Sequence, residues 1–132
     1  INPNFPFVFN NLGNVHKSLN NLNQAIECYE KAILLDPDFA EAYNNFGNAY
    51  KDLNDLNNAQ KSFEKAISIN PDFAEAHNNL GNIFKDLNEL DSALKSYEKA
   101  RLIRHDLDFV LGNINMDVKA HAFIDLDSLK TR

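Results

Sequence analysis

Asparagine is the residue type whose spacing in this chain could do chemistry, because its copies recur at a fixed interval of 34 residues. An asparagine amide carries both a hydrogen-bond donor and an acceptor, so it matches the N–H and C=O of a peptide unit. A row of such amides could hold an extended backbone with little regard for its side chains. The three rows at this interval are Asn11, Asn45, Asn79 and Asn113; Asn14, Asn48 and Asn82; and Asn10, Asn44 and Asn78. Compositional bias, with some contacts between neighbouring segments, is the alternative explanation.

Lysine forms a fourth row at the same interval, at Lys17, Lys51 and Lys85. A row of cations could favour an acidic peptide. Lysines are also common on protein surfaces as simply solvated side chains, so both interpretations stay open.

The chain lacks the residue patterns that catalysis and metal binding need. Neither an H-E-x-x-H motif nor a glycine-rich phosphate loop occurs. Cys28 is the only cysteine, which excludes an internal disulfide and a CxxC pair. We therefore expect no enzyme activity, no metal and no cofactor. The histidines are scattered, at His16, His77, His105 and His121.

Composition indicates a folded protein that does not suit nucleic acid. Hydrophobic residues make up 44% of the 132 residues and charged residues 24%, which is ordinary for a globular chain. The net charge of -6 opposes phosphate binding, so we expect no nucleic-acid partner and disfavour an RNA-binding role. No apolar stretch suits a membrane span, and we expect a cytoplasmic location. Because the chain begins with Ile1 and its only methionine is Met116, we expect it to be a piece of a longer protein.

The asparagine rows belong to a longer repeated pattern. Residues 39–48 read FAEAYNNFGN and residues 73–82 read FAEAHNNLGN, an offset of 34 residues. Each copy holds a glycine, then an alanine and an aromatic residue, and two copies close with Pro37 and Pro71, whereas His105 stands at the third position. The conserved positions within the three copies are Gly13, Gly47 and Gly81; Ala25, Ala59 and Ala93; and Tyr29, Phe63 and Tyr97.

This pattern resembles the tetratricopeptide repeat family over about residues 6–107. The resemblance implies an all-α fold, an α-solenoid of antiparallel helix hairpins that form a right-handed superhelix. We expect the repeats at 6–39, 40–73 and 74–107, after the tail of a preceding truncated repeat at 1–5 and before a capping helix and tail at 108–132. The predicted helices lie near residues 7–19, 23–35, 40–53, 57–69, 74–87, 91–103 and 107–118.

Local signals predict how the helices begin, end and cross. The glycines, with the alanines opposite, should let the helices of a hairpin approach closely, while the aromatic residue fills the remaining groove. His16 and His77 occupy aromatic packing positions. Left-handed turn residues are expected at Asn20, Asn54 and Asn88. Helix N-caps are expected at Asn23, Asn57 and Asp91, and capping boxes at Asp38 with Glu41 and at Asp72 with Glu75.

The resemblance implies a protein–protein interaction scaffold that binds an extended peptide or partner segment in its concave groove, at the asparagine and lysine rows. We expect the first row to face solvent, so that replacing Asn11, Asn45 and Asn79 with alanine leaves the fold nearly intact. The amino-acid sequence of the repeats is also similar to the repeat arm of O-linked N-acetylglucosamine transferases. The alternative is therefore that this chain is the substrate-recruiting repeat arm of such a glycosyltransferase.

Two further expectations concern partners. The two-carboxylate clamp of chaperone-binding members needs basic residues, but its matching positions hold Asn10, Glu75 and Asn79, so we expect no clamp of that kind. The amino-terminal end should expose an apolar face. We expect the chain to self-associate through it, with another copy or with its own carboxyl-terminal segment, at residues Phe5, Phe7, Val8 and Phe9.

Overall fold

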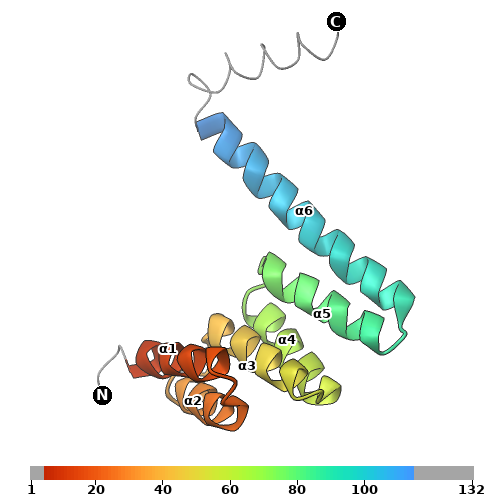
Figure 1. Ribbon diagram of the computed structural model, residues 1–132. Coiled ribbons are helices and arrows are strands. Elements are labelled where there is room, and N and C mark those ends of the chain that lie inside the picture. Colours follow the sequence, from red (N-terminus) through yellow and green to blue (C-terminus); the bar gives the residue numbers. More distant parts are fainter. Residues whose placement is uncertain (1–4, 115–132) are drawn as a thin grey trace, which may run out of the picture.

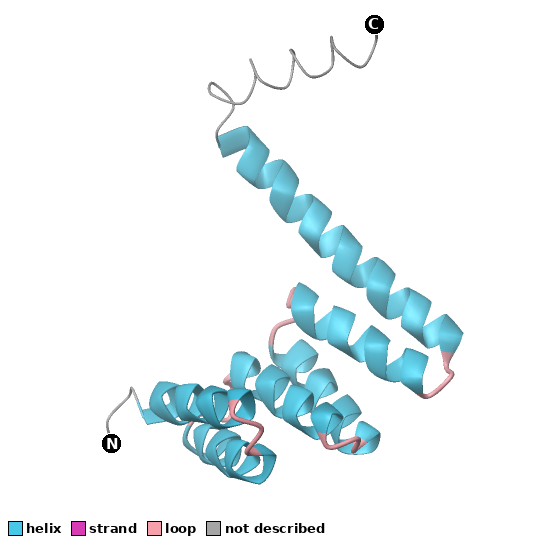
Figure 2. Cartoon of the chain, in the orientation of Figure 1, coloured by secondary structure: helices cyan, strands magenta, loops and turns pink. Residues whose placement is uncertain are grey.

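The protein is a stack of helical hairpins. A computed structural model describes residues 5–114, with side chains described through residue 107, and all regular structure in that range is helical (Figures 1 and 2). Successive helices pair as hairpins, and the three hairpins follow one another along the array (Figure 1). The helices are α1 (Phe5–Ser18), α2 (Leu22–Leu35), α3 (Ala40–Asp52), α4 (Leu56–Ile69), α5 (Ala74–Asp86) and α6 (Leu90–Ile114).

Each hairpin turns on one asparagine in the left-handed conformation. Asn20, Asn54 and Asn88 have φ values of 61°, 61° and 62°, as the sequence predicted. In the first turn the Asn21 amide donates to the His16 carbonyl at 2.7 Å and the Asn20 amide donates to the Lys17 carbonyl at 2.9 Å. This pair of bonds is the Schellman arrangement, which satisfies the last carbonyls of the helix. The same pair recurs in the other two turns.

The predicted N-caps of the second helices are wrong. The N-cap residues of α2 and α4 are Asn21 and Asp55, and the Asp55 carboxylate accepts from the Asn58 amide at 3.2 Å. Asn23, Asn57 and Asp91 lie inside the first turns of their helices. The helix can begin directly after the left-handed asparagine, because the turn already points the chain back along the first helix.

The predicted capping boxes are also wrong. The N-cap residues of α3 and α5 are Phe39 and Phe73, and neither has a side-chain cap. The preceding loops are ordered differently: the Asp36 side chain accepts from the Asp38 amide at 3.1 Å, and Asn70 does the same for Asp72. Asp38 and Asp72 therefore stand one residue too early to cap a helix.

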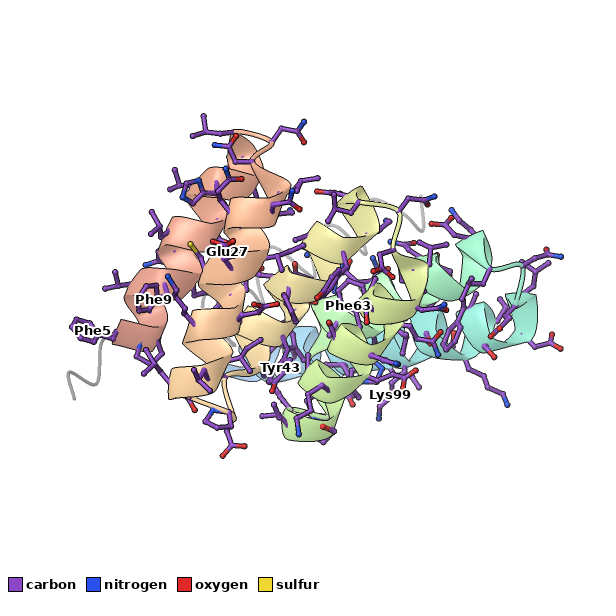
Figure 3. All side chains as sticks on the ribbon, turned by 90° about the horizontal axis from the view of Figure 1, so that it is seen from below. Phe5, Phe9, Glu27, Tyr43, Phe63 and Lys99 are labelled. Atoms are coloured by element: carbon purple, nitrogen blue, oxygen red, sulfur yellow. The ribbon has the colours of Figure 1, made fainter. Side chains whose placement is uncertain are left out.

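Within a hairpin, each conserved glycine faces the aromatic ring of the second helix. A Cβ atom added to Gly47 would stand 2.6 Å from Cε1 of Phe63, which is fully buried between the helices (Figure 3). Gly13 meets Tyr29 and Gly81 meets Tyr97 in the same way. The glycines thus make room for the rings, as the sequence predicted.

Between hairpins, the second helix of one repeat packs on the first helix of the next. Ala25 and Tyr29 of α2 form one cluster with Ala49 of α3, and Ile26 and Phe46 flank it. The corresponding cluster between α4 and α5 is larger, with Ala59, Phe63, Leu80 and Ile83 at its centre. Apolar burial therefore continues from repeat to repeat, as in other solenoids.

The predicted seventh helix is not separate in the described residues. The sequence predicted a break after residue 103 and a new helix at 107–118, but α6 runs without interruption from Leu90 to Ile114. The corresponding helices α2 and α4 stop before Pro37 and Pro71, because proline has no amide hydrogen and disfavours helix in the residue before it. His105 imposes no such stop. Residues 115–132 and residues 1–4 of the expected repeat tail lie outside the described range, whereas Phe5, the last residue of that tail, already begins α1.

Candidate peptide-binding groove

The first helices of the hairpins, α1, α3 and α5, carry the asparagine rows, and side-chain amides join these helices to one another. Asn45 donates through Nδ2 to Oδ1 of Asn10 at 3.0 Å, which links α3 to α1. Asn79 donates in the same way to Asn44 at 3.0 Å, which links α5 to α3. Asn10 and Asn44 are each only 1% exposed. Two of the three rows therefore supply the bonds between repeats.

These bonds correct the expectation that the first row simply faces solvent. Asn11 is exposed, but Asn45 and Asn79 are half-buried and each uses one amide hydrogen to satisfy a buried carbonyl. Asn113 lies near the end of α6 rather than on the first helix of a further hairpin, so it does not continue the row. Contacts between repeats thus explain part of the asparagine content.

The row at Asn14, Asn48 and Asn82 is positioned by the second helices. The hydroxyl of Tyr29 donates to Oδ1 of Asn14 at 2.6 Å, and Tyr97 donates in the same way to Asn82. Because the carbonyl oxygen is held, the amide Nδ2 groups of Asn14 and Asn82 are left as oriented donors. All three asparagines are half-buried. Phe63 has no hydroxyl, so Asn48 in the middle repeat lacks this restraint.

Burial keeps the tyrosine donor protonated. Desolvation raises the pKa of Tyr29 to about 12, with smaller contributions in the same direction from Cys28 and Asp52. The hydroxyl therefore carries its proton throughout the physiological pH range, and the Asn14 carbonyl keeps its donor.

The lysine row lies at the carboxyl ends of α1, α3 and α5. Lys17 and Lys51 are half-buried and Lys85 is exposed. Within residues 5–107 the ion pair that forms is a different one, between Arg101 and Glu98, two neighbours on α6. Its hydrogen bond lowers the pKa of the Glu98 carboxyl.

An open pocket at the last hairpin was missed by the sequence analysis. Its volume is about 410 Å³, and it brings the asparagine row at Asn78 next to two arginines of α6. Arg101 occupies the position of Ile33 and Ile67 in the earlier repeats, and this in-phase change from isoleucine to arginine was the signal available in the sequence. The lining residues are Asn78, Tyr97, Ala100, Arg101, Arg104 and His105.

The two histidines at aromatic positions of the repeat are half-buried and differ in their polar contacts. The ring Nε2 of His77 lies 2.9 Å from the carbonyl oxygen of Pro71, across the loop that precedes α5. Nδ1 of His16 is buried and has no partner among the described residues.

Over the same part of the chain, no three His, Cys, Asp or Glu side chains gather as a metal site would require. Nor does any helix in the described range have the length and apolarity to cross a membrane.

Comparison with known families agrees with this architecture. A profile described as TPR repeat matches residues 13–53 and 47–87, and one described as tetratricopeptide repeat matches residues 74–107. The chain belongs to the tetratricopeptide repeat family. None of the curated proteins compared matches its sequence significantly.

Solved structures of repeat proteins are similar to it. The crystal structure of MamA superposes with a TM-score of 0.76 at 26% identity, covering 78% of this chain and 60% of MamA, so the match spans less than two thirds of that protein. The first TPR domain of human RPAP3 gives 0.74 at 26% identity, with 76% of this chain and 80% of that one covered. The first TPR of Spaghetti (RPAP3), bound to the HSP90 peptide SRMEEVD, gives 0.75 at 24% identity and covers 78% and 82%.

Proposed function

We propose that this chain is a protein–protein interaction scaffold that binds an extended peptide or partner segment along α1, α3 and α5. Its chemistry is recognition and not catalysis. The contacts come from the Nδ2 donors of Asn14, Asn48 and Asn82, with Asn11, Asn45 and Asn79 beside them. The lysine row lies one turn further along the same helices.

The observation that carries the proposal is the pair of tyrosine-to-asparagine hydrogen bonds. In each pair the tyrosine hydroxyl holds the Oδ1 atom of a half-buried asparagine. The same bond therefore fixes the direction in which the Nδ2 group of that asparagine points. Donors held in place before binding lose less conformational entropy when they meet a backbone carbonyl. The arrangement therefore suits an acceptor-rich strand of peptide.

The remaining capacity of the neighbouring row supports the same proposal. Asn45 and Asn79 each use one amide hydrogen between repeats, which leaves the carbonyl oxygen and a second hydrogen on each. These groups could accept from and donate to the same peptide backbone. Such contacts read the backbone, so the ligand sequence would be constrained by shape and charge more than by individual side chains.

Charge favours an acidic ligand. Lys17, Lys51 and Lys85 line one end of the row, and Arg101 and Arg104 reach the pocket at the last hairpin. The similar Spaghetti domain holds a peptide with two glutamates and an aspartate, which supports an acidic peptide here. The usual carboxylate clamp is not expected, because Asn10 is buried in a bond to Asn45 at the position where the clamp needs a cation.

The test uses an immobilised peptide array followed by titration of the strongest binder. Changing Asn14, Asn48 and Asn82 together to aspartate preserves an acceptor for Tyr29 and Tyr97 but removes every donor. If each donor contributes about 0.5–1.5 kcal/mol, affinity falls by roughly ten- to two-thousand-fold.

The matched control replaces two exposed asparagines on the second helices, Asn23 and Asn57, with alanine, and affinity should not change. An acidic and a neutral ligand are compared, because the added carboxylates repel only the former. Equal binding by the wild type and the triple variant, with both helical by circular dichroism, would remove the groove asparagines from the binding site.

The alternative of a glycosyltransferase arm gains no support from the comparisons described above. The cytoplasmic location and the absence of nucleic-acid partners stay predictions from composition.

A further inference from the structure

The outer side of α1 is an apolar face without a partner in the described residues. Val8 is 54% exposed, and the other members of this face are also large and exposed. In the second repeat the corresponding residues are buried or half-buried except Leu53, which is 43% exposed at the end of α3. In the third repeat all of them are buried or half-buried. Phe5 lies at the outer edge of the described part of the array in Figure 3. The α1 face consists of Phe5, Val8, Leu12, Val15 and Leu19.

The opposite end of the array carries the complementary face on α6. Leu94, 68% exposed, occupies the position of Ile26, which packs against α3 from α2. Leu90 is exposed too, at the position of Leu56, and Tyr97 is half-buried at the position of Phe63. The α6 face, defined by Leu90, Leu94 and Tyr97, therefore repeats the surface on which α3 and α5 already pack.

The polar link between repeats is open at both ends as well. Asn11 stands where Asn45 and Asn79 donate to the preceding repeat, and it is exposed. Asn78 stands where Asn10 and Asn44 accept from the following repeat, and it lines the open pocket beside Tyr97. Within the described residues, one end offers the donor half of the bond and the other end offers the acceptor half.

We propose that the chain binds a second copy of itself head to tail. The α1 face of one copy packs on the α6 face of the other, and Asn11 donates to Asn78 across the junction. The interface repeats the α2–α3 and α4–α5 packing within the chain. A contact of this kind is heterologous and leaves a free face at each end, so further copies add in an open series.

Arg101 sets the strength of this contact. It replaces the isoleucine of the earlier repeats, and its guanidinium is held by Glu98 through Nε and Nη2. Because the guanidinium is engaged by Glu98, only the aliphatic part of the Arg101 side chain can pack on Phe5 of the other copy. Arg104, also on α6, gains no ion pair at the junction, because α1 of the other copy contains no acidic residue. The junction is therefore weaker than the internal ones, and association depends on protein concentration.

The test is sedimentation velocity of the 132-residue chain over a concentration series. Val8→Glu removes the α1 face and Leu94→Glu removes the α6 face, and each variant alone should be monomeric. Mixed together they should form a closed one-to-one dimer, because each supplies the face that the other lacks. Both substituted residues are mostly exposed, so the fold is kept, and circular dichroism checks this.

Controls separate this arrangement from others. Leu34→Glu, at a residue 81% exposed on α2 and outside both faces, should associate like the wild type. Asn78→Ala should weaken association by about two- to tenfold through the lost hydrogen bond. A dimer that Val8→Glu abolishes and Leu94→Glu does not would show a symmetric α1–α1 contact and overturn the proposal. So would a monomer at every concentration, whatever covers the α1 face. The Val8→Glu and Leu94→Glu tests are separate from the peptide-binding test, because neither residue belongs to the asparagine rows, although Asn11 takes part in both proposals.

Discussion

Asn79 donates through Nδ2 to Oδ1 of Asn44, a residue that precedes it by 35 positions and is almost completely buried. Asn45 and Asn10 stand in the same relation one repeat earlier. A shift of one first helix along the next would leave a buried carbonyl unpaired, which is costly. We infer that the amide pair helps to fix the register of successive repeats, which apolar packing specifies less sharply.

Asn79→Ala should therefore lower the free energy of unfolding by about 1–3 kcal/mol, because the Asn44 carbonyl loses its donor in a buried place. This differs from the sequence-based expectation of an intact fold. Urea unfolding followed by circular dichroism measures the change. Asn57→Ala, at an exposed position on α4, is the control and should stay within about 0.5 kcal/mol of the wild type. A value for Asn79→Ala inside that same range would mean that water replaces the lost donor at no cost.

Gly47→Ala should destabilise the middle hairpin, because the new methyl group would stand 2.6 Å from a ring carbon of buried Phe63. The better helix propensity of alanine offsets part of the strain, so we expect a net loss of about 1–2 kcal/mol. The same substitution in a Phe63→Leu background should cost little or even stabilise. An equal cost in both backgrounds would show that the ring is not what excludes the methyl group.

Tyr29→Phe should lower stability by about 0.5–1.5 kcal/mol at neutral pH, since the Asn14 carbonyl loses its donor. The difference depends on pH. The pKa of this tyrosine is raised from 10.0, the value for an unburied side chain, to about 12 in the folded protein. As the pH rises, the unfolded chain therefore releases the hydroxyl proton before the folded chain does. The wild type thus keeps its full advantage below pH 10 and loses it as the pH rises toward 12. Chemical unfolding of both proteins at several pH values tests this, and a constant difference across the range would contradict it.

Asn54→Ala should cost about 1–2 kcal/mol, because a residue with a Cβ atom and no local hydrogen-bonding group is strained at a φ of 61°. Asn54→Gly should stay close to the wild type, since glycine adopts this conformation freely. The side chain is exposed, so burial does not complicate the comparison. Thermal unfolding of the two variants measures the difference in stability. Equal stability of Asn54→Ala and Asn54→Gly would show that the left-handed conformation at this position causes no strain.

The sequence predicted the hairpins because their signals are periodic and local. The glycine, the facing aromatic and the left-handed asparagine recur with the repeat, and each is needed for a steric reason. The N-caps were misplaced because Asn23 and Asp38 have the right chemistry at positions shifted by one or two residues from where the backbone turns. A propensity cannot resolve such a shift when several polar residues are adjacent.

The site was less predictable, because the function of an asparagine depends on which helix its amide meets. Asn11 and Asn45 are equivalent in the repeat pattern, yet only Asn45 has a preceding repeat in the described structure to which it can donate. The Tyr29 and Tyr97 hydroxyls were assigned only to packing, since a pattern that accepts tyrosine and phenylalanine alike hides the hydrogen bond. The pocket at Arg101 arises where the pattern ends, and periodic reasoning is weakest there.

The uninterrupted course of α6 also has a mechanical consequence. With 25 residues against the 14 of α2 and α4, it is about 16 Å longer than a repeat helix. α2 and α4 are each followed by a loop, which can bend when the chain beyond it is pulled sideways. α6 has no such break, so we infer that a sideways force on its carboxyl-terminal end is transmitted to α5, where the Tyr97 ring lies against Gly81.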